Sequence, residues 1–354
     1  MARPIAVHPT KGTFSDRWIQ YCEEHGISHR IVNCYSTDII AQLRDCSALL
    51  WHIRHGTATD LMIGRHVLLA AAAMGLKVFP DHNTAWHFDD KIAQKYLLEA
   101  IHAPLVPSWV FYNLEGAIAW IETASFPKVF KLRRGSGSRN VRLARTKAQA
   151  ASLARQAFSG GFRLSGTASQ ELWKVTHHWR KRDLTEFLMG LPGKARNRLR
   201  LDRAVGRERG YVYFQEFMAA NEFDTRISII GNRAFGFTRN VRPGDFRASG
   251  SGRIVFDRSR IDPAAIRIAF HVAQTLQTQS CAFDFVNDGS GRTKICEISF
   301  GYEPGPVHDA GGFWDLDLNW HEGPTWPEDA ILGDLLDQIQ YGGNGGEARG
   351  IVGK

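Results

Sequence analysis

Short apolar runs alternate with amphipathic stretches along the first eighty residues. Strands are predicted at residues 4–9, 29–35, 47–53 and 77–80, and helices at about 15–25 and 60–74. Interleaved buried strands and helices are typical of a small parallel sheet that is covered on its faces. Gly26 and Gly75 each follow a helical stretch and precede a strand, as glycines that end helices do. The pattern therefore predicts an α/β lobe.

The pattern changes after the turn-like residues 80–83. A stretch with helical apolar spacing follows, for which Asn83 is the predicted N-cap. An extended segment broken by Pro104 and Pro107 comes next. A helix near 114–123, a strand at 128–132 and a returning strand from Val141 are then predicted. These elements fit a small second lobe.

From Tyr211 apolar and polar residues alternate along the chain, as they do in the strands of an antiparallel sheet. The apolar and polar positions predict strands in the segments YVYFQEFM, TRISIIG, RAFGFTRNVR, CAFDFVND and TKICEISF, with one helix at about 263–279. No internal repeat interrupts this order. The whole chain is therefore predicted to be α/β in the wider α+β sense, with a parallel lobe, a small central lobe and an antiparallel lobe.

Composition narrows the class of protein. No run approaches eighteen apolar residues, so we expect no membrane span and a cytoplasmic location. Five cysteines without a C-x-x-C pair argue against a disulfide framework and against a structural zinc site. The net charge is +8, and residues 163–209 carry twelve Lys or Arg against five Asp or Glu, which gives +7. A solvated helical face is the favoured interpretation of this basic segment, and a nucleic-acid partner is not expected.

The segment VFKLRRGSGSRNVRL, residues 129–143, places a glycine- and serine-rich loop between two predicted strands. Such a loop lets backbone N–H groups close on an anion, and phosphate is the obvious guest. The loop has neither the GK[ST] of a Walker A motif nor the G-x-G-x-x-G of a dinucleotide fold. Taken alone, a plain hairpin with a basic tip explains it about as well. Lys131, on the preceding strand, could meet phosphate oxygens as a point charge.

Two carboxylates near the end of the chain are flanked by apolar residues. Asp284 in AFDFV and Glu297 in ICEIS lie on two strands that we expect to be neighbours. A carboxylate in such a setting needs a cation or a buried partner. Magnesium shared with phosphate oxygens suits the pair, and a lysine partner for Asp284 is the alternative. The histidines, among them His52 and His55, show no metal-ligand spacing and are expected on the surface or satisfied in the core.

The order of these motifs resembles the ATP-grasp superfamily and, within it, the RimK-like carboxylate–amine ligases. The resemblance covers residues 78–300. It rests on Asp-Lys at 90–91, P-x-V-x-K at 127–131, the Gly/Ser loop, Gln-Glu-Phe at 215–217, Asp-x-Arg at 224–226, Asp-Phe-Arg at 245–247, and the late Asp284 and Glu297. It implies the ATP-grasp fold, with a pre-ATP-grasp lobe in front and a lid in the middle, and ATP and Mg²⁺ as cofactors.

The resemblance also implies roles for individual residues. The residues expected to contact ATP are Lys91, Lys131, Gly135, Ser136, Gly137, Ser138, Gln215, Glu216, Phe217, Met218 and Asp224, with Glu222 as the alternative to Asp224 for the ribose. Lys131, Arg226 and Arg239 are expected to stabilise charge during catalysis. The metal set would be Asp284, Glu297 and Ser299. The family usually has Glu-x-Asn, and serine is a shorter and poorer ligand than asparagine, so one metal contact is expected to be indirect or missing.

The sequence indicates the substrates less directly than the cofactors. The resemblance implies a small-molecule carboxylate and an amine, and no nucleophilic side chain. Arg242 and Arg247 are assigned to the acid because guanidinium groups bind carboxylates in a bidentate manner. Glu303, His308 and Asp309 are candidates for orienting the amine. They lie in an irregular tail that we expect to lack core elements. The tail either forms a wall of the acceptor pocket or packs its tryptophans over the sheet. Its W-D-x-x-L-N-W-H-E-G ending is similar to ATP-grasp proteins linked with surface polysaccharides, which suggests a sugar acid.

Two other functions stay open at this stage. An ATP-grasp phosphotransferase would use the same nucleotide site without an amine. A non-catalytic protein would bind a polyanion through the basic segment. The predicted divisions are an N-terminal domain at 1–85, a lid at 86–160, a basic insert at 161–210, a C-terminal domain at 211–340 and a flexible tail at 341–354. The insert is expected to act as a lid edge or an oligomer contact, and a homodimer is left open.

Overall fold

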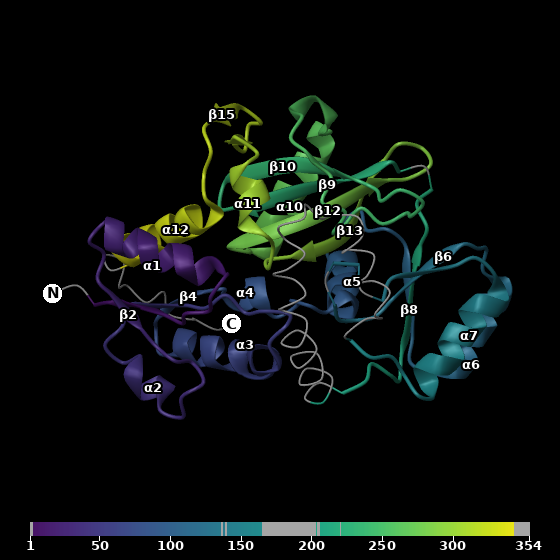
Figure 1. Cartoon of the computed structure of the whole chain (residues 1–354), viewed down its shortest axis with the longest axis horizontal. Helices are drawn as coiled ribbons and strands as arrows, with labels where there is room; N and C mark the ends of the chain where they lie inside the picture. The colour runs from purple at the N-terminus through teal and green to yellow at the C-terminus, as the bar shows by residue number, and fades with distance from the viewer. Residues whose placement is uncertain are drawn as a thin grey trace, which may run out of the picture.

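The computed structural model describes residues 3–135, 137–138, 140–164, 203, 206–219 and 221–342. Most of the basic segment at 163–209 and most of the tail at 341–354 lie outside these residues, so the expectations for both are not tested. Within the described residues the strands form three sheets, each with its own helices (Figure 1).

The first sheet is parallel, as the alternation of strands and helices predicts. Its strands, in spatial order, are β2 (His29–Ile31), β1 (Ile5–Val7), β3 (Ala48–Leu50) and β4 (Lys77–Phe79). The residues of β1 and β3 are fully buried, because helices cover both faces. Gly26 and Gly75 have φ values of 64° and 88°, which confirms them as left-handed residues after helices.

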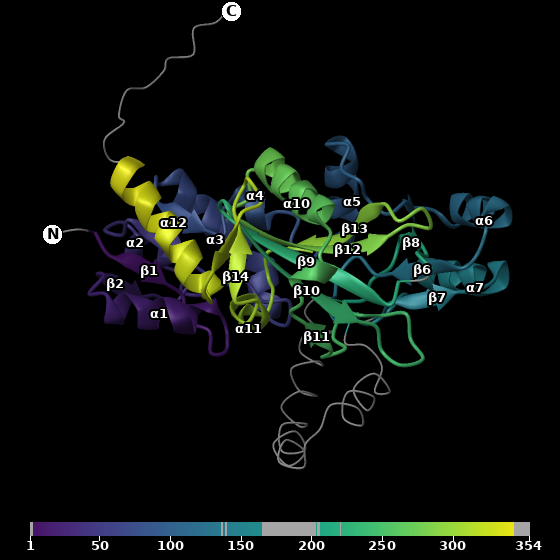
Figure 2. The same ribbon diagram turned by 90° about the horizontal axis from the view of Figure 1, so that it is seen from above.

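The helices of this lobe come from both ends of the chain. They are α1 (Phe14–Glu24), α2 (Ile39–Gln42), α3 (Ala58–Ala73), α4 (His82–Ala85) and the C-terminal α12 (Pro327–Gly342). Helix α12 lies beside α1 in both views (Figures 1 and 2). Arg17 of α1 donates to both carboxylate oxygens of Asp329 at 2.8 and 2.7 Å, and Trp18 Nε1 donates to the carbonyl oxygen of Glu328 at 3.1 Å. The last helix therefore closes the first lobe.

The second sheet is small and antiparallel. Its order is β5 (Ser108–Phe111), β8 (Val212–Glu216), β6 (Lys128–Lys131) and β7 (Arg142–Ala144). Helices α6 (Leu114–Thr123) and α7 (Lys147–Phe158) pack on one face, where Phe130 and Phe214 are fully buried. The alternating residues of β6 and β8 on the other face, including Lys131, are left to face the rest of the molecule.

The third sheet is the largest. Its strands are β13 (Thr293–Ser299), β12 (Ser280–Asn287), β9 (Phe223–Ile230), β10 (Arg233–Asn240), β14 (Gly312–Trp314) and β15 (Trp320–Glu322), with β11 (Ile254–Val255) paired to β10. Helix α10 (Pro263–Leu276) covers one face, and the short elements η1 (Arg258–Arg260) and α11 (Pro304–His308) flank the sheet. The ladders between these strands are antiparallel, as predicted, and a parallel bridge joins Ile295 of β13 to Leu105 outside the sheet.

Helix α5 (Lys91–Ala100) connects the lobes, and its start corrects a prediction. Asn83 is not its N-cap but lies inside α4. Asp89 has a left-handed backbone conformation, with φ 55°, and so separates the two helices. The Asp90 carboxylate accepts hydrogen bonds from the N–H groups of Ile92 and Ala93 at 3.2 and 3.0 Å. Asp90 is therefore the N-cap of α5, because its carboxylate accepts the N–H groups of the first turn, whereas Asn83 belongs to the preceding helix. The cap places Lys91 in the first turn.

The tail after β13 contains core elements, contrary to expectation. Tyr302 and Val307 are buried in the core of the first lobe. Strand β14 pairs with β10 at Ala234, and the rings of Trp314 and Trp320 lie 4.7 Å apart. The prediction was wrong because the glycines and prolines indicated an irregular segment. The strands β14 and β15 have only three residues each, so they fit between these residues. Of the two roles considered for the tail, tryptophan packing is therefore present.

Candidate functional site

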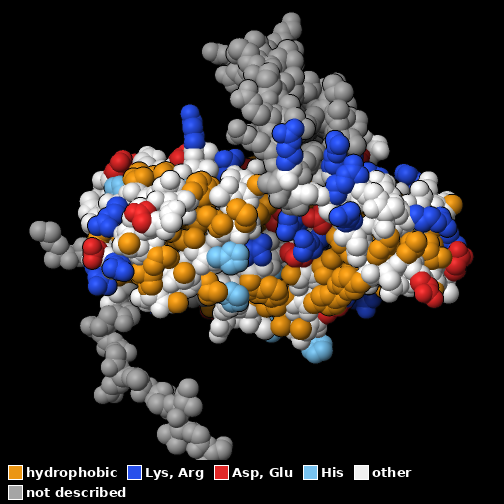
Figure 3. Space-filling view, turned by 90° about the horizontal axis from the view of Figure 1, so that it is seen from below, with side chains coloured by type: hydrophobic (Ala, Val, Ile, Leu, Met, Phe, Trp, Pro, Cys, Tyr) orange, Lys and Arg blue, Asp and Glu red, His pale blue; other side chains and the backbone are white. Residues whose placement is uncertain are grey.

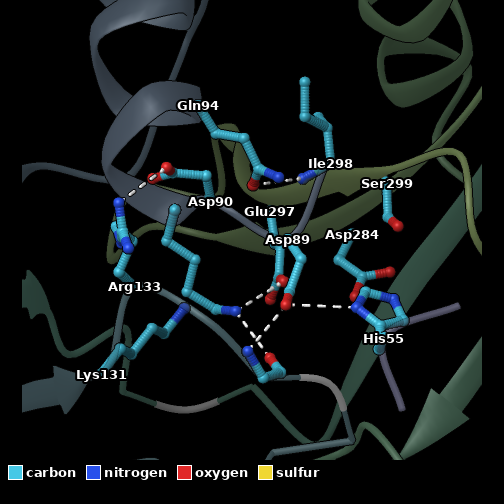
Figure 4. A network of polar contacts seen from close by, with 12 residues as sticks. His55, Asp89, Asp90, Gln94, Lys131, Arg133, Asp284, Glu297, Ile298 and Ser299 are labelled. Carbon is cyan, nitrogen blue, oxygen red and sulfur yellow. Dashed lines mark hydrogen bonds and ion pairs between the residues drawn. The ribbon is translucent and has the colours of Figure 1, made fainter. Parts of the chain in front are cut away.

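The first group of candidate residues meets where α5 begins. Lys91 Nζ donates to the carbonyl oxygen of Gly135 at 2.8 Å and lies 3.0 Å from Glu297 Oε1 (Figure 4). Its backbone N–H donates to the carbonyl oxygen of Arg133 at 3.0 Å. Three segments that are far apart in the sequence are thereby joined: the start of α5, the Gly/Ser loop and strand β13. Only 8% of the Lys91 side chain is exposed, so its charge is held inside the site.

Lys131 brings a second buried ammonium group to the same place. Its Nζ lies 3.4 Å from Cys296 Sγ, and Cys296 also contacts Gln215 Oε1 at 3.5 Å. Burial alone would lower the pKa of Lys131, but the neighbouring Cys296 and Glu297 raise it above its ordinary value. Lys131 is therefore cationic at neutral pH. Figure 4 shows Lys131, Glu297, Asp89 and Asp284 around one space.

A carboxylate that the sequence did not single out supports the loop. Asp89 Oδ1 accepts the N–H of Gly135 at 2.7 Å and lies 3.1 Å from His55 Nδ1. Burial raises the pKa of Asp89, but His55, Lys91 and the loop N–H outweigh it and hold the pKa below its usual range. Asp89 is therefore ionised and links His55 to the Gly/Ser loop. The sequence could have indicated Asp89 through the acidic pair that precedes Lys91. Its pairing with His55 could not be predicted, because His55 is distant in the sequence.

Ion pairs cross one face of the third sheet from β10 to β13. Arg239 lies opposite Asp224, Arg226 lies opposite Asp284, and Asp284 lies opposite Glu297 in the strand register. Arg239 donates to both oxygens of Asp224 at 2.8 and 2.7 Å, and Arg226 donates to both oxygens of Asp284 at 2.7 and 2.8 Å. Arg239 Nη2 also lies 2.9 Å from Asp284 Oδ1. The charges alternate from Arg239 through Asp224 and Arg226 to Asp284, and Glu297 on β13 places a second carboxylate beside Asp284.

Asp224 and Asp284 are both largely buried, but their pKa values shift in opposite directions. Burial raises the pKa of Asp284, but Arg226 and Arg239 together overcome burial and hold this pKa well below its usual range. Burial raises the pKa of Asp224, and its single partner Arg239 does not fully offset it. The pKa of Arg239 is raised by Asp284 and Asp224 against its own burial. Asp284 is therefore held in its charged form more strongly than Asp224.

The predicted metal set lies together, but its carboxylates already have partners. Asp284 and Glu297 are cross-strand neighbours, and Ser299 lies two residues further along β13 on the same face. Both oxygens of Asp284 accept from arginine, whereas the Glu297 side chain is 33% exposed and pairs through Oε1. Ser299 Oγ donates to the carbonyl oxygen of Gly301 at 3.2 Å. Within the described ranges no group of three or more His, Cys, Asp or Glu is arranged around a common metal position.

These contacts decide how the residues fit a magnesium ion. Two carboxylates and a hydroxyl on one face have the oxygen chemistry that magnesium prefers. Glu297 is accessible, while Asp284 would have to exchange an arginine contact for the metal. The set therefore fits an ion that takes its remaining ligands from a nucleotide and from water, as magnesium usually does, and does not fit an all-protein cage.

The predicted adenine hinge begins on β8. Gln215 is buried, and its Nε2 donates to the carbonyl oxygen of Cys296 at 3.3 Å. Glu216 forms an ion pair with Lys128, whose Nζ donates to its two carboxylate oxygens at 2.8 and 2.7 Å. Lys128 was missed because a lysine on a strand has no local signal for its cross-strand partner. The Gln215 contact ties the hinge to the Lys131 environment.

The next two hinge residues leave the sheet. The rings of Phe217 and Phe246 meet edge to face at 5.7 Å between their centroids. The Met218 carbonyl oxygen accepts from Asn221 Nδ2 at 3.2 Å. Phe246 belongs to the Asp-Phe-Arg motif, so the end of the hinge and that motif lie in contact.

The Gly/Ser loop meets the segment that carries two of the predicted substrate arginines. Ser138 Oγ donates to the carbonyl oxygen of Ser249 at 3.2 Å, and Arg242 Nη2 donates to the same oxygen at 2.6 Å. Arg247 pairs with Asp245, so its guanidinium group is engaged locally. Gly137 precedes Ser138 with φ 63°, while Ser136 lies outside the described residues.

Glu303 and His308 lie apart from the lysines. Glu303 is an exposed residue immediately before α11, and its side chain makes no capping hydrogen bond. The ring of His308 stacks on Trp326 at 4.1 Å, and its Nδ1 lies 3.1 Å from Asp309 Oδ1. No hydrogen bond or ion pair among the described residues joins either one to Lys91 or Lys131. The amine-binding assignment therefore has no contact that supports it.

Comparison with solved structures identifies the architecture. A RimK domain ATP-grasp protein from Sphaerobacter thermophilus matches with a TM-score of 0.56 and 16% identity over 94% of this chain and 98% of its own. D-alanine–D-alanine ligase from Bacillus anthracis, solved with ATP, matches with a TM-score of 0.57 and 12% identity over 97% and 99%. The ATP-grasp ligase PsnB, solved with a minimal precursor, Mg and ADP, gives 0.54 and 11% over 96% and 98%. The chain has the ATP-grasp fold.

The likeness to these ATP-grasp structures is one of fold, because their sequences differ from this one at more than four positions in five. No protein-family model and no curated protein sequence matches the chain. The ATP-grasp architecture explains why the first lobe, the small central sheet and the large sheet follow in this order. None of the helices in the described ranges is both long and apolar enough to cross a membrane.

Proposed function

We propose that the chain is an ATP- and magnesium-dependent ligase that joins a carboxylate to an amine through a C–N bond and releases ADP. The observation that supports it most is that two buried lysines lie close to Glu297: Lys91 pairs with Glu297 and with the Gly/Ser loop, and Lys131 contacts the adjacent Cys296. Two buried cations beside a glycine- and serine-rich loop suit a polyphosphate. The solved ATP-grasp neighbours are ligases, which favours this reaction for the same fold.

In the proposed reaction the γ-phosphoryl group passes from ATP to the substrate carboxylate, which gives an acyl phosphate and ADP. The amine nitrogen then attacks the carbonyl carbon, the C–O bond to phosphate breaks, and the nitrogen loses a proton. Lys91 and Lys131 hold phosphate oxygens, and residues 135–138 cover them. Gln215 to Met218 take the adenine edge and Asp224 the ribose. No nucleophilic side chain is needed.

The buried arginines are proposed to stabilise the transferring group. Arg226 and Arg239 are fixed by Asp224 and Asp284, so their N–H groups are oriented before a substrate arrives. Preorganised donors lower a barrier because little reorganisation accompanies the reaction. Glu297, Asp284 and Ser299 would hold magnesium, which neutralises phosphate charge when bound. Arg242 is proposed for the acid, because its contact with Ser249 places it beside the Gly/Ser loop.

A steady-state assay separates the ligase from a phosphotransferase. ADP release is measured with acids alone, amines alone and both together, in the presence of MgATP. The proposal expects sustained ADP release only with an acid and an amine, and one amide formed per ADP. Sustained release with one substrate and a stable phosphorylated product would show a phosphotransferase instead. The narrower expectation of a sugar acid rests on the tail alone, so sugar acids form one set within the panel and simple amino acids another.

A further inference from the structure

A cavity lies on the side of α5 away from Lys91. Its volume is about 570 Å³. Ala93 and Tyr96 of α5 line it, whereas Lys91 and Gln94 of the same helix face the lysine site. Positions 93 and 96 are on roughly the opposite side of a helix from position 91. The other lining residues are Asp90, Ile92, Tyr112, Arg133, Arg134, Arg207, Glu208, Arg209, Gly210 and Tyr211. We name it the arginine cavity.

The arginine cavity carries an excess of positive charge. Four arginines and two carboxylates line it, which gives +4 − 2 = +2. Arg133 lies 3.5 Å from Asp90 and 3.7 Å from Glu208, and Arg134 lies 3.8 Å from Glu208. These distances exceed those of charge-assisted hydrogen bonds, about 2.7–2.9 Å. Figure 3 shows Lys and Arg side chains gathered near the middle of one face, with a few acidic side chains among them.

One guanidinium group has an unmet donor. Arg133 Nε is buried and makes no hydrogen bond within the described part of the chain. A buried N–H without an acceptor is destabilising, so an oxygen supplied by a ligand would stabilise it. Arg209 is exposed and makes no salt bridge with a described residue. The carboxylates therefore do not satisfy the arginines.

Three tyrosines line the arginine cavity: Tyr211 is fixed by hydrogen bonds in its wall, and Tyr96 and Tyr112 lie at its exposed rim. Tyr211 donates to Glu208 at 2.7 Å and accepts the Arg133 backbone N–H at 2.7 Å. At the rim, the hydroxyls of Tyr96 and Tyr112 lie 3.1 Å apart, and the two residues are 47% and 58% exposed. Exposed tyrosine rings beside arginines suit a ligand that has a charged end and a less polar body.

We propose that the arginine cavity binds a small oxyanion ligand, an organic phosphate or carboxylate, separately from the nucleotide site. Its volume falls in the range of small-ligand pockets, roughly 300–1,000 Å³. Guanidinium groups bind both kinds of oxyanion through paired N–H donors. Figure 4 shows Asp90 and Arg133 paired on one side of the network, with His55 and Asp284 on the opposite side. The inference does not depend on the ligase reaction.

The test measures binding of two probes, pyrophosphate and citrate, by titration calorimetry without magnesium or nucleotide. It uses the full-length Lys131→Ala variant, so that the lysine site contributes little. The expected result is saturable binding of at least one probe, weakened about tenfold or more when Arg133→Gln and Arg209→Gln are added. The stronger probe, confirmed by competition, identifies phosphate or carboxylate as the preferred oxyanion.

A matched control separates the cavity from general charge. Arg145→Gln with Arg155→Gln removes the same charge from two exposed arginines outside the cavity, and should leave the affinity within about twofold. Equal losses in both double variants, or no saturable binding of either probe, would overturn the proposal. Should Arg133→Gln unfold the protein, the exposed pair Arg207→Gln and Arg209→Gln replaces it. Loss of nucleotide binding with retained probe binding would count against the ligase alone.

Discussion

Asp284 and Glu297 face each other across β12 and β13, yet each carboxylate has a different cation: Asp284 is held by Arg226 and Arg239, and Glu297 by Lys91. This division separates two tasks. The Asp284 group is buried and organises arginines, whereas Glu297 is partly exposed and adjoins the Gly/Ser loop. Changes at the two carboxylates should therefore have different effects on stability and activity.

Glu297→Gln should abolish catalysis and leave the fold intact. The substitution keeps the size of the side chain but removes a carboxylate that adjoins Lys91 and is proposed to hold magnesium. We expect acid- and amine-dependent ADP release to fall by roughly 100-fold or more, the scale for losing one transition-state contact. Circular dichroism should be unchanged. Glu322→Gln, at an exposed glutamate of β15, is the control, and near-normal turnover by Glu297→Gln would remove its assigned role.

Asp224→Asn should lower the free energy of unfolding. The change takes the bidentate partner from Arg239, which is itself buried. Breaking a buried ion pair costs about 3–5 kcal/mol, and the remaining contact with Asp284 places the expected loss near the lower end. Urea unfolding measures it, with exposed Asp317→Asn as the control. An unfolding free energy equal to that of the control would show that the pair contributes nothing.

Glu328 should make stability depend on pH. Burial in the first turn of α12, with Asp329 adding to it, raises the pKa of Glu328 to about 7 from 4.5. The folded state then binds this proton more tightly than the unfolded state. Its contribution is therefore most favourable below pH 4.5 and is lost as pH rises to about 7, by up to roughly 3 kcal/mol.

Glu328→Gln tests that dependence directly. The variant cannot ionise at this position, so it should be more stable than the parent at pH 8 and similar to it near pH 4.5. Chemical unfolding at the two pH values measures the difference, and Asp337→Asn, an exposed change on the same helix, should show none. A parent and a Glu328→Gln variant with parallel pH profiles would contradict the raised pKa.

Local patterns predicted most strands, the helices α1, α3, α5, α6 and α10, and the opposition of Asp284 and Glu297, because alternation and strand order depend on residues that are near in the sequence. The partners of those carboxylates were not predictable. Whether Asp284 meets a metal, a lysine or two arginines depends on β9 and β10, which lie far away in the sequence. Asn83 was misjudged for a related reason, since the left-handed turn at Asp89 that moves the helix start is set by contacts with His55 and Gly135.

The central claim is a nucleotide site built on Lys131 and Lys91, and thermal unfolding tests it most directly. A ligand that binds only the folded state raises the unfolding temperature by mass action. MgADP at millimolar concentration should give a clear rise in the parent and in Lys147→Ala, an exposed lysine on α7, and none in Lys131→Ala. No rise in the parent, or an equal rise in Lys131→Ala, would contradict the account.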